Sequence, residues 1–111
     1  MATSKLFQPI QFANLTLQHR VVMAPLSRLR ADNNHTHTDL AVEHYAARAS
    51  IPGTLIISEA TYIAHTASGM SFNIPGIWSD EQVLAWKRVR LYDTSPTCLD
   101  LAQHIHPSIA R

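Results

Sequence analysis

One side chain next to an apolar run is a candidate for ligand chemistry. Ser27 lies two residues after Pro25 and one after Leu26, directly beyond the apolar run VVMA. A hydroxyl at the end of a strand can donate a hydrogen bond to a ligand. A serine that follows a proline closely also forms turns without any ligand. On its residue type alone, Ser27 is a turn former.

A carboxylate holds the corresponding position after a second apolar run. Glu59 follows TLIIS directly, and a buried carboxylate at a strand end could take part in acid–base catalysis. An ion pair with Arg28 or Arg30 is the simpler interpretation. We therefore predict a structural role for Glu59 and name no catalytic residue.

Seven histidines suggest a metal site, but their spacing does not support one. His35 and His37 lie in a polar loop, and His104 and His106 lie near the C-terminus. Neither pair has a carboxylate at metal-ligand spacing, and Cys98 has no second cysteine nearby. We predict no metal.

The aromatic residues are better explained by packing than by catalysis. Tyr45 and Tyr62 are expected in the core or at its rim, and Trp78 and Trp86 are expected to anchor the last helix. None of them is assigned as a proton donor.

The first elements that must position these residues are a hairpin and a strand. Residues 7–18 alternate apolar and polar side chains on both sides of a turn at Ala13 and Asn14, which predicts a β-hairpin. Residues 21–24 are continuously apolar, which is typical of a strand buried on both faces.

A helix and a second strand follow a polar loop over residues 31–38. Thr38 is a suitable N-cap, and the helix should end near Ser50 because Pro52 and Gly53 cannot continue it. Residues 54–58 are again typical of a buried strand.

The last predicted helix follows a long loop over residues 60–78. Ser79 and Gln82 have the spacing of a capping box, so the helix should start at Ser79. Residues 92–111 are predicted to be irregular, with one helical turn around residues 100–105.

Strands that alternate with helices predict an α/β fold with a parallel sheet. Two parallel strands do not complete a sheet, because each needs neighbours on both edges. The chain has 111 residues, 46% hydrophobic and 15% charged, with a formal net charge of +1. These values exclude a nucleic-acid footprint and a membrane span, and we expect a cytoplasmic protein.

Three blocks of sequence resemble the Old Yellow Enzyme family of FMN-dependent ene-reductases and NADPH dehydrogenases. The blocks are RVVMAPLSRLRA, EHYAARAS with PGTLIISEAT, and PGIWSDEQVLAWK. The resemblance covers residues 5–89 and is strongest to secondary-metabolite and alkaloid-pathway reductases. It implies the start of a (β/α)8 TIM barrel, namely the floor hairpin and the first two β/α units.

The resemblance also implies cofactor contacts, because active sites of such barrels lie at the carboxyl ends of the strands. In the family, the backbone at Pro25 and Leu26 lines the FMN, and a hydroxyl at Ser27 bonds the flavin carbonyl. Ala60 matches a small residue whose backbone approaches the flavin. NADPH is the family co-substrate, and small molecules are its substrates.

The chain departs from the family after Val89. Residues 90–111, RLYDTSPTCLDLAQHIHPSIAR, match no family segment, and Gln103 does not have the neighbours of the flavin-contacting glutamine. We therefore divide the chain into residues 1–89, the N-terminal part of the barrel, and residues 90–111, a divergent tail. A shifted reading frame or a mis-spliced exon would explain such a tail. The residues that grip the substrate, protonate the alkene and hold the FMN phosphate have no counterpart here.

Two interpretations of function follow. The first is a truncated FMN- and NADPH-dependent oxidoreductase that is inactive and does not retain FMN, because a closed barrel takes about 250 residues. The second is a small interaction module that pairs with another polypeptide or self-associates through its open strand edges. An autonomous domain with a new site at the HTH or HIH segment has no positive support.

Overall fold

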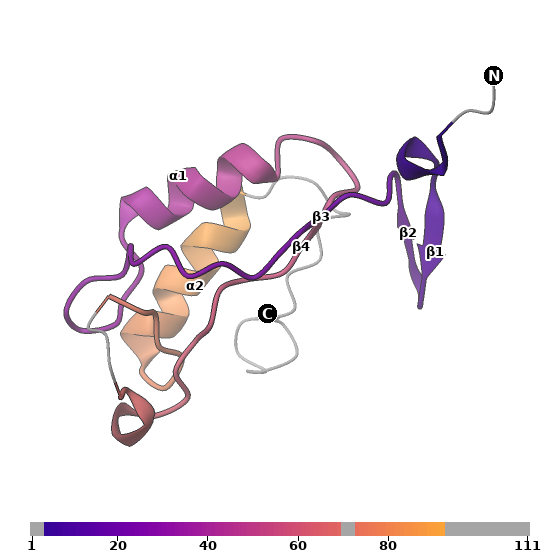
Figure 1. Ribbon diagram of the computed structural model, residues 1–111. Helices are drawn as coiled ribbons and strands as arrows, with labels where there is room; N and C mark the ends of the chain where they lie inside the picture. The colour runs from indigo at the N-terminus through magenta and orange to yellow at the C-terminus, as the bar shows by residue number, and fades with distance from the viewer. Residues whose placement is uncertain (1–3, 70–72, 93–111) are drawn as a thin grey trace.

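The computed structural model describes residues 4–69 and 73–92 of the chain. Its regular elements are chiefly two small sheets and two α-helices, which are joined by long loops, as Figure 1 shows. The predictions for residues 93–111, including the helical turn, Cys98, Gln103, His104 and His106, lie outside the described residues. Within the described part, no helix is long and apolar enough to cross a membrane.

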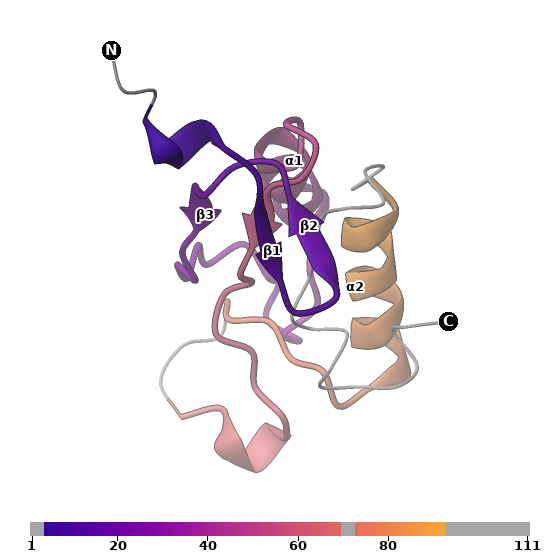
Figure 2. The ribbon, with the colours of Figure 1, turned by 90° about the vertical axis from the view of Figure 1, so that its right-hand side faces the viewer.

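The N-terminal hairpin is confirmed. A short 3-10 helix, η1 (Lys5–Phe7), leads into strands β1 (Ile10–Phe12) and β2 (Leu15–Leu17), which pair antiparallel. Ala13 makes the turn in the left-handed region, at φ 52°. The hairpin stands at one end of the molecule, with both helices behind it when it is viewed end on (Figure 2).

The second sheet is a pair of parallel strands, β3 (Val22–Met23) and β4 (Leu55–Ile56). Val22 pairs with Leu55, and Met23 with Ile56. The Ile57 N–H donates to the Met23 carbonyl at 3.1 Å, which extends the pairing by one residue. The predicted strands are therefore present, and each is shorter than its apolar run.

The expected burial holds for β4 but is wrong for β3. Both residues of β4 are buried, whereas 41% of Val22 is exposed. In the part of the chain that the structure describes, β3 has β4 as its sole strand neighbour. An apolar strand is buried on both faces only when other layers cover it.

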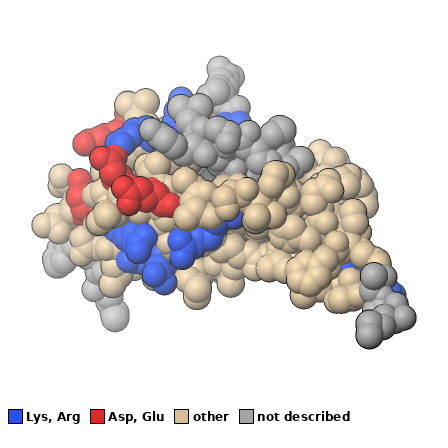
Figure 3. All heavy atoms as spheres, turned by 90° about the horizontal axis from the view of Figure 1, so that it is seen from above, with Lys and Arg blue, Asp and Glu red and all other residues tan. Residues whose placement is uncertain are grey.

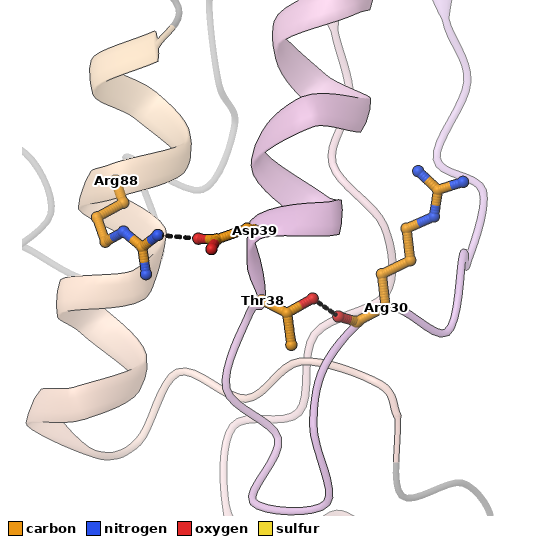
Figure 4. Close-up of polar contacts among 4 residues, drawn as sticks. All are labelled: Arg30, Thr38, Asp39 and Arg88. Carbon is orange, nitrogen blue, oxygen red and sulfur yellow. Dashed lines mark hydrogen bonds and ion pairs between the residues drawn. The ribbon is translucent and has the colours of Figure 1, made fainter.

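Helix α1 (Asp39–Arg48) begins and ends as expected, except for its cap. Thr38 is the N-cap residue, but its hydroxyl makes no capping bond. It donates instead to the Arg30 carbonyl at 2.6 Å, which ties the helix start to the segment after β3 (Figure 4). The helix ends at Arg48, with Ala49 as its C-cap.

Helix α2 (Asp80–Tyr92) begins with the predicted capping box. The Gln82 N–H donates to Ser79 Oγ at 3.3 Å, and the Ser79 N–H donates back to Gln82 Oε1 at 3.2 Å. Arg88 of this helix pairs with Asp39 at the start of α1, and both side chains are largely exposed (Figure 4).

The core lies between the two helices and the parallel strands. Trp86 is its largest fully enclosed aromatic residue, with 1% exposed. The buried cluster comprises Val42, Tyr45, Ala49, Ile56, Ile77, Val83, Trp86 and Val89. The predicted anchoring role is confirmed for Trp86, whereas Trp78 is half-buried and packs on His35.

The loop before α2 folds back on itself. It contains a short 3-10 helix, η2 (His65–Ala67), and an isolated bridge between Tyr62 and Gly76. The Gly76 N–H also donates to the His35 carbonyl at 2.8 Å, so the two long loops are joined.

Candidate functional site

The segments that follow β3 and β4 leave the parallel pair at the same end (Figure 1). Val22 pairs with Leu55 and Met23 with Ile56, and further along the two segments the Arg28 N–H lies 3.2 Å from Glu59 Oε2, next to Ser27 and Ala60. The carboxyl ends of parallel strands are where barrel enzymes place their active sites. The two strands thus bring these two residues to one surface.

All four residues expected at a cofactor are exposed at this surface. Pro25, Leu26 and Ser27 follow β3, and Ala60 follows β4 after Glu59. Leu26 has 58% of its surface exposed, and the Ser27 hydroxyl has no hydrogen bond with any residue described here. The four residues offer a small side chain, a hydroxyl and accessible backbone. These groups are compatible with contact to a planar flavin ring.

Glu59 joins the two segments, although not through the ion pair that was predicted. Its Oε2 accepts the backbone N–H of Arg28 at 3.2 Å, and the structure shows no ion pair to the guanidinium of Arg28 or Arg30. Its Oε1 accepts the hydroxyl of Tyr45 at 3.2 Å. Arg28 thus contributes a main-chain donor to the Glu59 carboxylate.

Burial controls the ionisation of Glu59. Desolvation raises the pKa of the Glu59 carboxyl, while the hydrogen bonds from Arg28 and Tyr45 and the charges of Arg28 and Arg30 oppose that rise. Only 3% of Glu59 is exposed. A carboxylate with two donors in such a place holds structure together more readily than it exchanges protons with solvent.

A basic group surrounds His44 on α1. Burial lowers the pKa of His44 to about 4, and the nearby charges of Arg48, Arg30 and Arg28 add to the effect. Figure 3, seen from above, shows basic side chains gathered next to an acidic group on this face. Since the basic and acidic side chains are neighbours there, the face does not carry charge of a single sign.

The histidines of the HTH segment are buried, which the sequence did not indicate. His35 Nδ1 lies 2.7 Å from the Ile74 carbonyl oxygen, and His37 lies against Tyr45 and Trp86. Burial lowers the pKa of His37 to about 4, and neither of its ring nitrogens has a hydrogen-bond partner among the described residues. Residues 4–69 and 73–92 contain no group of three histidine, cysteine or carboxylate side chains that could hold a metal ion.

Two hollows lie away from the four expected cofactor residues. An open one of about 720 Å³ lies at the start of α2, between His35, His65 and Trp78. The other, of about 480 Å³, is almost wholly apolar and lies along β3, where Val22 and Ile51 form part of its wall.

The Glu59–Tyr45 link was missed at the level of sequence. The available signal was Tyr45 on the inward face of a helical pattern, together with a carboxylate at the end of a buried strand. Buried polar groups need partners, and these two could have been paired on that ground.

Comparison with known proteins identifies a family over most of the chain. Residues 5–91 match the NADH:flavin oxidoreductase / NADH oxidase family. The chain is 56% identical over 86 residues to the NADP-dependent oxidoreductase lnbE of Aspergillus flavus, covering 78% of this chain and 22% of that protein. It is 48% identical over 89 residues to the probable inactive reductase easA of Epichloe festucae var. lolii, covering 80% and 23%.

A solved structure gives the same result. The old yellow enzyme homologue NCR from Zymomonas mobilis superposes with a TM-score of 0.76 at 44% identity, covering 87% of this chain and 26% of that one. The chain therefore spans about a quarter of the length of the proteins that it matches.

Proposed function

Because this chain belongs to the NADH:flavin oxidoreductase / NADH oxidase family, we propose that it is the N-terminal, flavin-facing segment of an FMN-dependent oxidoreductase that uses NADPH. The relatives include a NADP-dependent oxidoreductase and a reductase named as probably inactive. The proposed substrate is a small molecule of secondary metabolism.

One observation carries this proposal. Ser27 and Ala60 are exposed in the segments that follow two neighbouring parallel strands at their carboxyl ends, and the Arg28 N–H donates to Glu59 Oε2 across these segments at 3.2 Å. In barrels of this architecture, that end holds the reacting groups. The position agrees with the roles that the family resemblance implies for these residues.

The chain's own part in the chemistry is orientation. A bound FMN would supply hydride transfer, and the protein tunes a flavin through the groups next to its ring. The Ser27 hydroxyl would donate a hydrogen bond to a ring carbonyl, and the backbone at Pro25 and Leu26 would lie against the ring. Ala60 would keep its side of the ring free of bulk.

These 111 residues are proposed not to turn over on their own. A single hydroxyl bond adds about 1 kcal/mol of net stabilisation, whereas association alone costs at least about 4 kcal/mol. The proposed division of the chain, with residues 1–89 as the barrel segment and 90–111 as a separate tail, places no further flavin contact in this polypeptide.

A chimera tests the proposal. Residues 5–91 of this chain replace the matching segment of the Aspergillus flavus relative, and the purified protein is tested for bound FMN and NADPH oxidation. We expect both, and we expect Ser27→Ala to shift the flavin absorption bands and reduction potential while Ser27→Thr, which keeps the hydroxyl, does not. A chimera that unfolds cooperatively but holds no flavin would contradict the proposal.

A second candidate function is supported by the free edge of β3. Because the Met23 carbonyl accepts the Ile57 N–H, the main-chain groups of Val22 face the opposite edge, where no strand lies among the described residues. The apolar hollow with Val22 and Ile51 in its wall lies beside β3. In a closed barrel each strand has two neighbours, so we propose that the occupant is a strand of a barrel from the same family.

Mixing experiments test the pairing. The chain is combined with the remaining segment of the Aspergillus flavus relative, and the mass of the complex is measured by light scattering. A 1:1 complex that is lost in Val22→Pro supports the proposal, since proline removes the edge N–H. A homo-oligomer of this chain alone, or two unmixed monomers, would contradict it.

A further inference from the structure

We propose that Glu59 and Tyr45 are positioning residues that hold the segment of Ser27 and the segment of Ala60 at a fixed separation. The purpose of this link rests on the proposed function, because it assumes that a flavin meets both segments. The link itself is a matter of geometry and can be tested without a flavin.

The carboxylate of Glu59 bridges two strand ends. It belongs to the residue directly before Ala60, and its Oε2 accepts the backbone N–H of Arg28, the residue directly after Ser27, at 3.2 Å. The regular ladder between β3 and β4 stops at the bond from Ile57 to Met23. Beyond that point, the Glu59 side chain joins the two segments through its bond with the Arg28 N–H.

Tyr45 fixes the carboxylate from behind. Its hydroxyl donates to Glu59 Oε1 at 3.2 Å and accepts the backbone N–H of Glu59 at 3.1 Å. The tyrosine stands on α1, with 5% of its surface exposed. The Tyr45 hydroxyl therefore orients both the side chain and the main chain of Glu59. Through Glu59 it also connects the segments after β3 and β4 to helix α1.

The backbone leading to Ala60 is held as well. Thr61 Oγ1 donates to the Glu59 carbonyl at 3.0 Å. Glu59 thus uses its N–H, its carbonyl and both carboxylate oxygens. Because all of these polar groups are hydrogen-bonded, Glu59 is held in one orientation, and this fixes the direction of the chain at Ala60.

A purely structural alternative makes a different prediction. If Glu59 were only a satisfied core residue, its removal would lower the stability of the whole domain and affect all amides together. A positioning role predicts a local effect at Arg28 that leaves the strand ladder intact. Amide hydrogen exchange separates the two cases, because it reports local and global opening residue by residue.

The experiment uses the full 111-residue chain and measures exchange by NMR for the wild type and three variants. Losing the acceptor in Glu59→Ala should speed exchange at the Arg28 amide by about tenfold, while the Ile57 amide changes by less than about threefold. Glu59→Gln keeps a carbonyl oxygen for Arg28 and should stay close to the wild type. Tyr45→Phe keeps the ring but should also speed exchange at Arg28.

Three outcomes would overturn the inference. The first is an unprotected Arg28 amide in the wild type. The second is a rise at Arg28 and Ile57 by the same factor. The third is an unchanged Arg28 in both Glu59→Ala and Tyr45→Phe. If Glu59→Ala fails to fold, Tyr45→Phe and Glu59→Gln still decide the matter, because both keep the core volume.

A second measurement separates this inference from the proposed function, and it uses the chimera described above, because the chain alone is proposed not to retain FMN. Glu59→Ala and Glu59→Gln are made in the chimera, and its bound FMN and flavin absorption bands are measured. The proposed function expects bound FMN in the unsubstituted chimera, and the inference expects Glu59→Ala to shift the absorption bands while Glu59→Gln does not. A chimera without FMN contradicts the flavin-facing role and leaves the exchange result intact. Unchanged absorption bands in Glu59→Ala contradict the positioning role.

Discussion

The ring of His37 stands edge-on to the ring of Trp86, with the two centroids 4.2 Å apart and the planes at 79°. Both side chains are buried, and the indole N–H of Trp86 donates elsewhere, to the Gly76 carbonyl at 3.1 Å. In the part of the chain that the structure describes, neither ring nitrogen of His37 has a hydrogen-bond partner. The histidine is thus packed as a neutral aromatic ring, and this has consequences for stability in acid.

Stability should fall as the pH drops from about 6.5 towards 4. Burial lowers the pKa of His37 and of His44 to about 4, from an ordinary value of 6.5. Between these values the unfolded chain takes up protons that the folded chain does not, so each histidine removes up to about 1.4 kcal/mol per pH unit. The Glu59 carboxyl acts in the opposite direction, because burial raises its folded pKa. Urea denaturation at a series of pH values measures the slope.

Replacing the buried ring isolates its share of this slope. His37→Phe keeps the edge-on contact with Trp86 and removes the titrating group, so we expect a shallower dependence on pH and no loss of stability at pH 7. His44→Gln tests the second histidine separately. An unchanged slope in both variants would show that neither histidine is buried in its neutral form.

How far the sequence predicts the fold depends on how local each signal is. The start of α2 was predictable because Ser79 and Gln82 satisfy each other within one turn. The exposure of Val22 was not, because burial of a strand depends on neighbours that the sequence of the strand does not specify. Local rules succeed where the partner of a group lies a few residues away.

The candidate site follows the same rule. Ser27 and Ala60 could be placed at strand ends from the apolar runs that precede them, but the bond from Arg28 to Glu59 joins residues 31 positions apart. Its geometry depends on the register of β3 and β4, which two short strands do not reveal in advance. The predicted ion pair correctly made Arg28 a neighbour of Glu59, but the donor is the Arg28 backbone N–H and not its guanidinium.

Gly53 should not tolerate a side chain. Its φ is +76°, and an added Cβ would lie 2.7 Å from the Cβ of Gln18 and 2.9 Å from its backbone nitrogen. Gly53→Ala should lower the free energy of unfolding by at least about 2 kcal/mol, from strain and overlap together. Gly69→Ala is the matched control, because nothing lies within 4 Å of its added Cβ. Equal urea midpoints for the two variants would contradict the close approach of the hairpin to residue 53.

Trp86→Phe should destabilise the core more than its loss of size suggests. The substitution leaves a cavity and removes the donor to the buried Gly76 carbonyl, and together these should cost about 2–4 kcal/mol. Leu84→Ala on the same helix, where 60% of the side chain is exposed, should cost less than about 1 kcal/mol. Thermal unfolding of both variants compares the two positions. A Trp86→Phe variant as stable as Leu84→Ala would mean that the indole bond contributes nothing.

Gln82 connects the start of α2 to a distant loop, so its removal should have two effects. Its Oε1 accepts the backbone N–H groups of Trp78 and Ser79, and its Nε2 donates to the Asn34 carbonyl at 3.1 Å. Gln82→Ala should lower the free energy of unfolding by about 1.5–3 kcal/mol, because two helix-entry donors and one loop carbonyl lose their partner. Gln82→Glu keeps the two acceptor bonds and loses the donor, so it should retain the helix start and lose the tie to Asn34. Glu81→Ala, at an exposed neighbouring position, should change stability by about 0.5 kcal/mol or less. Amide exchange at Trp78 and Ser79 separates the two contributions. We expect rapid exchange in Gln82→Ala and slow exchange in Gln82→Glu. Rapid exchange in both variants would show that the bond to Asn34 alone provides the stabilisation.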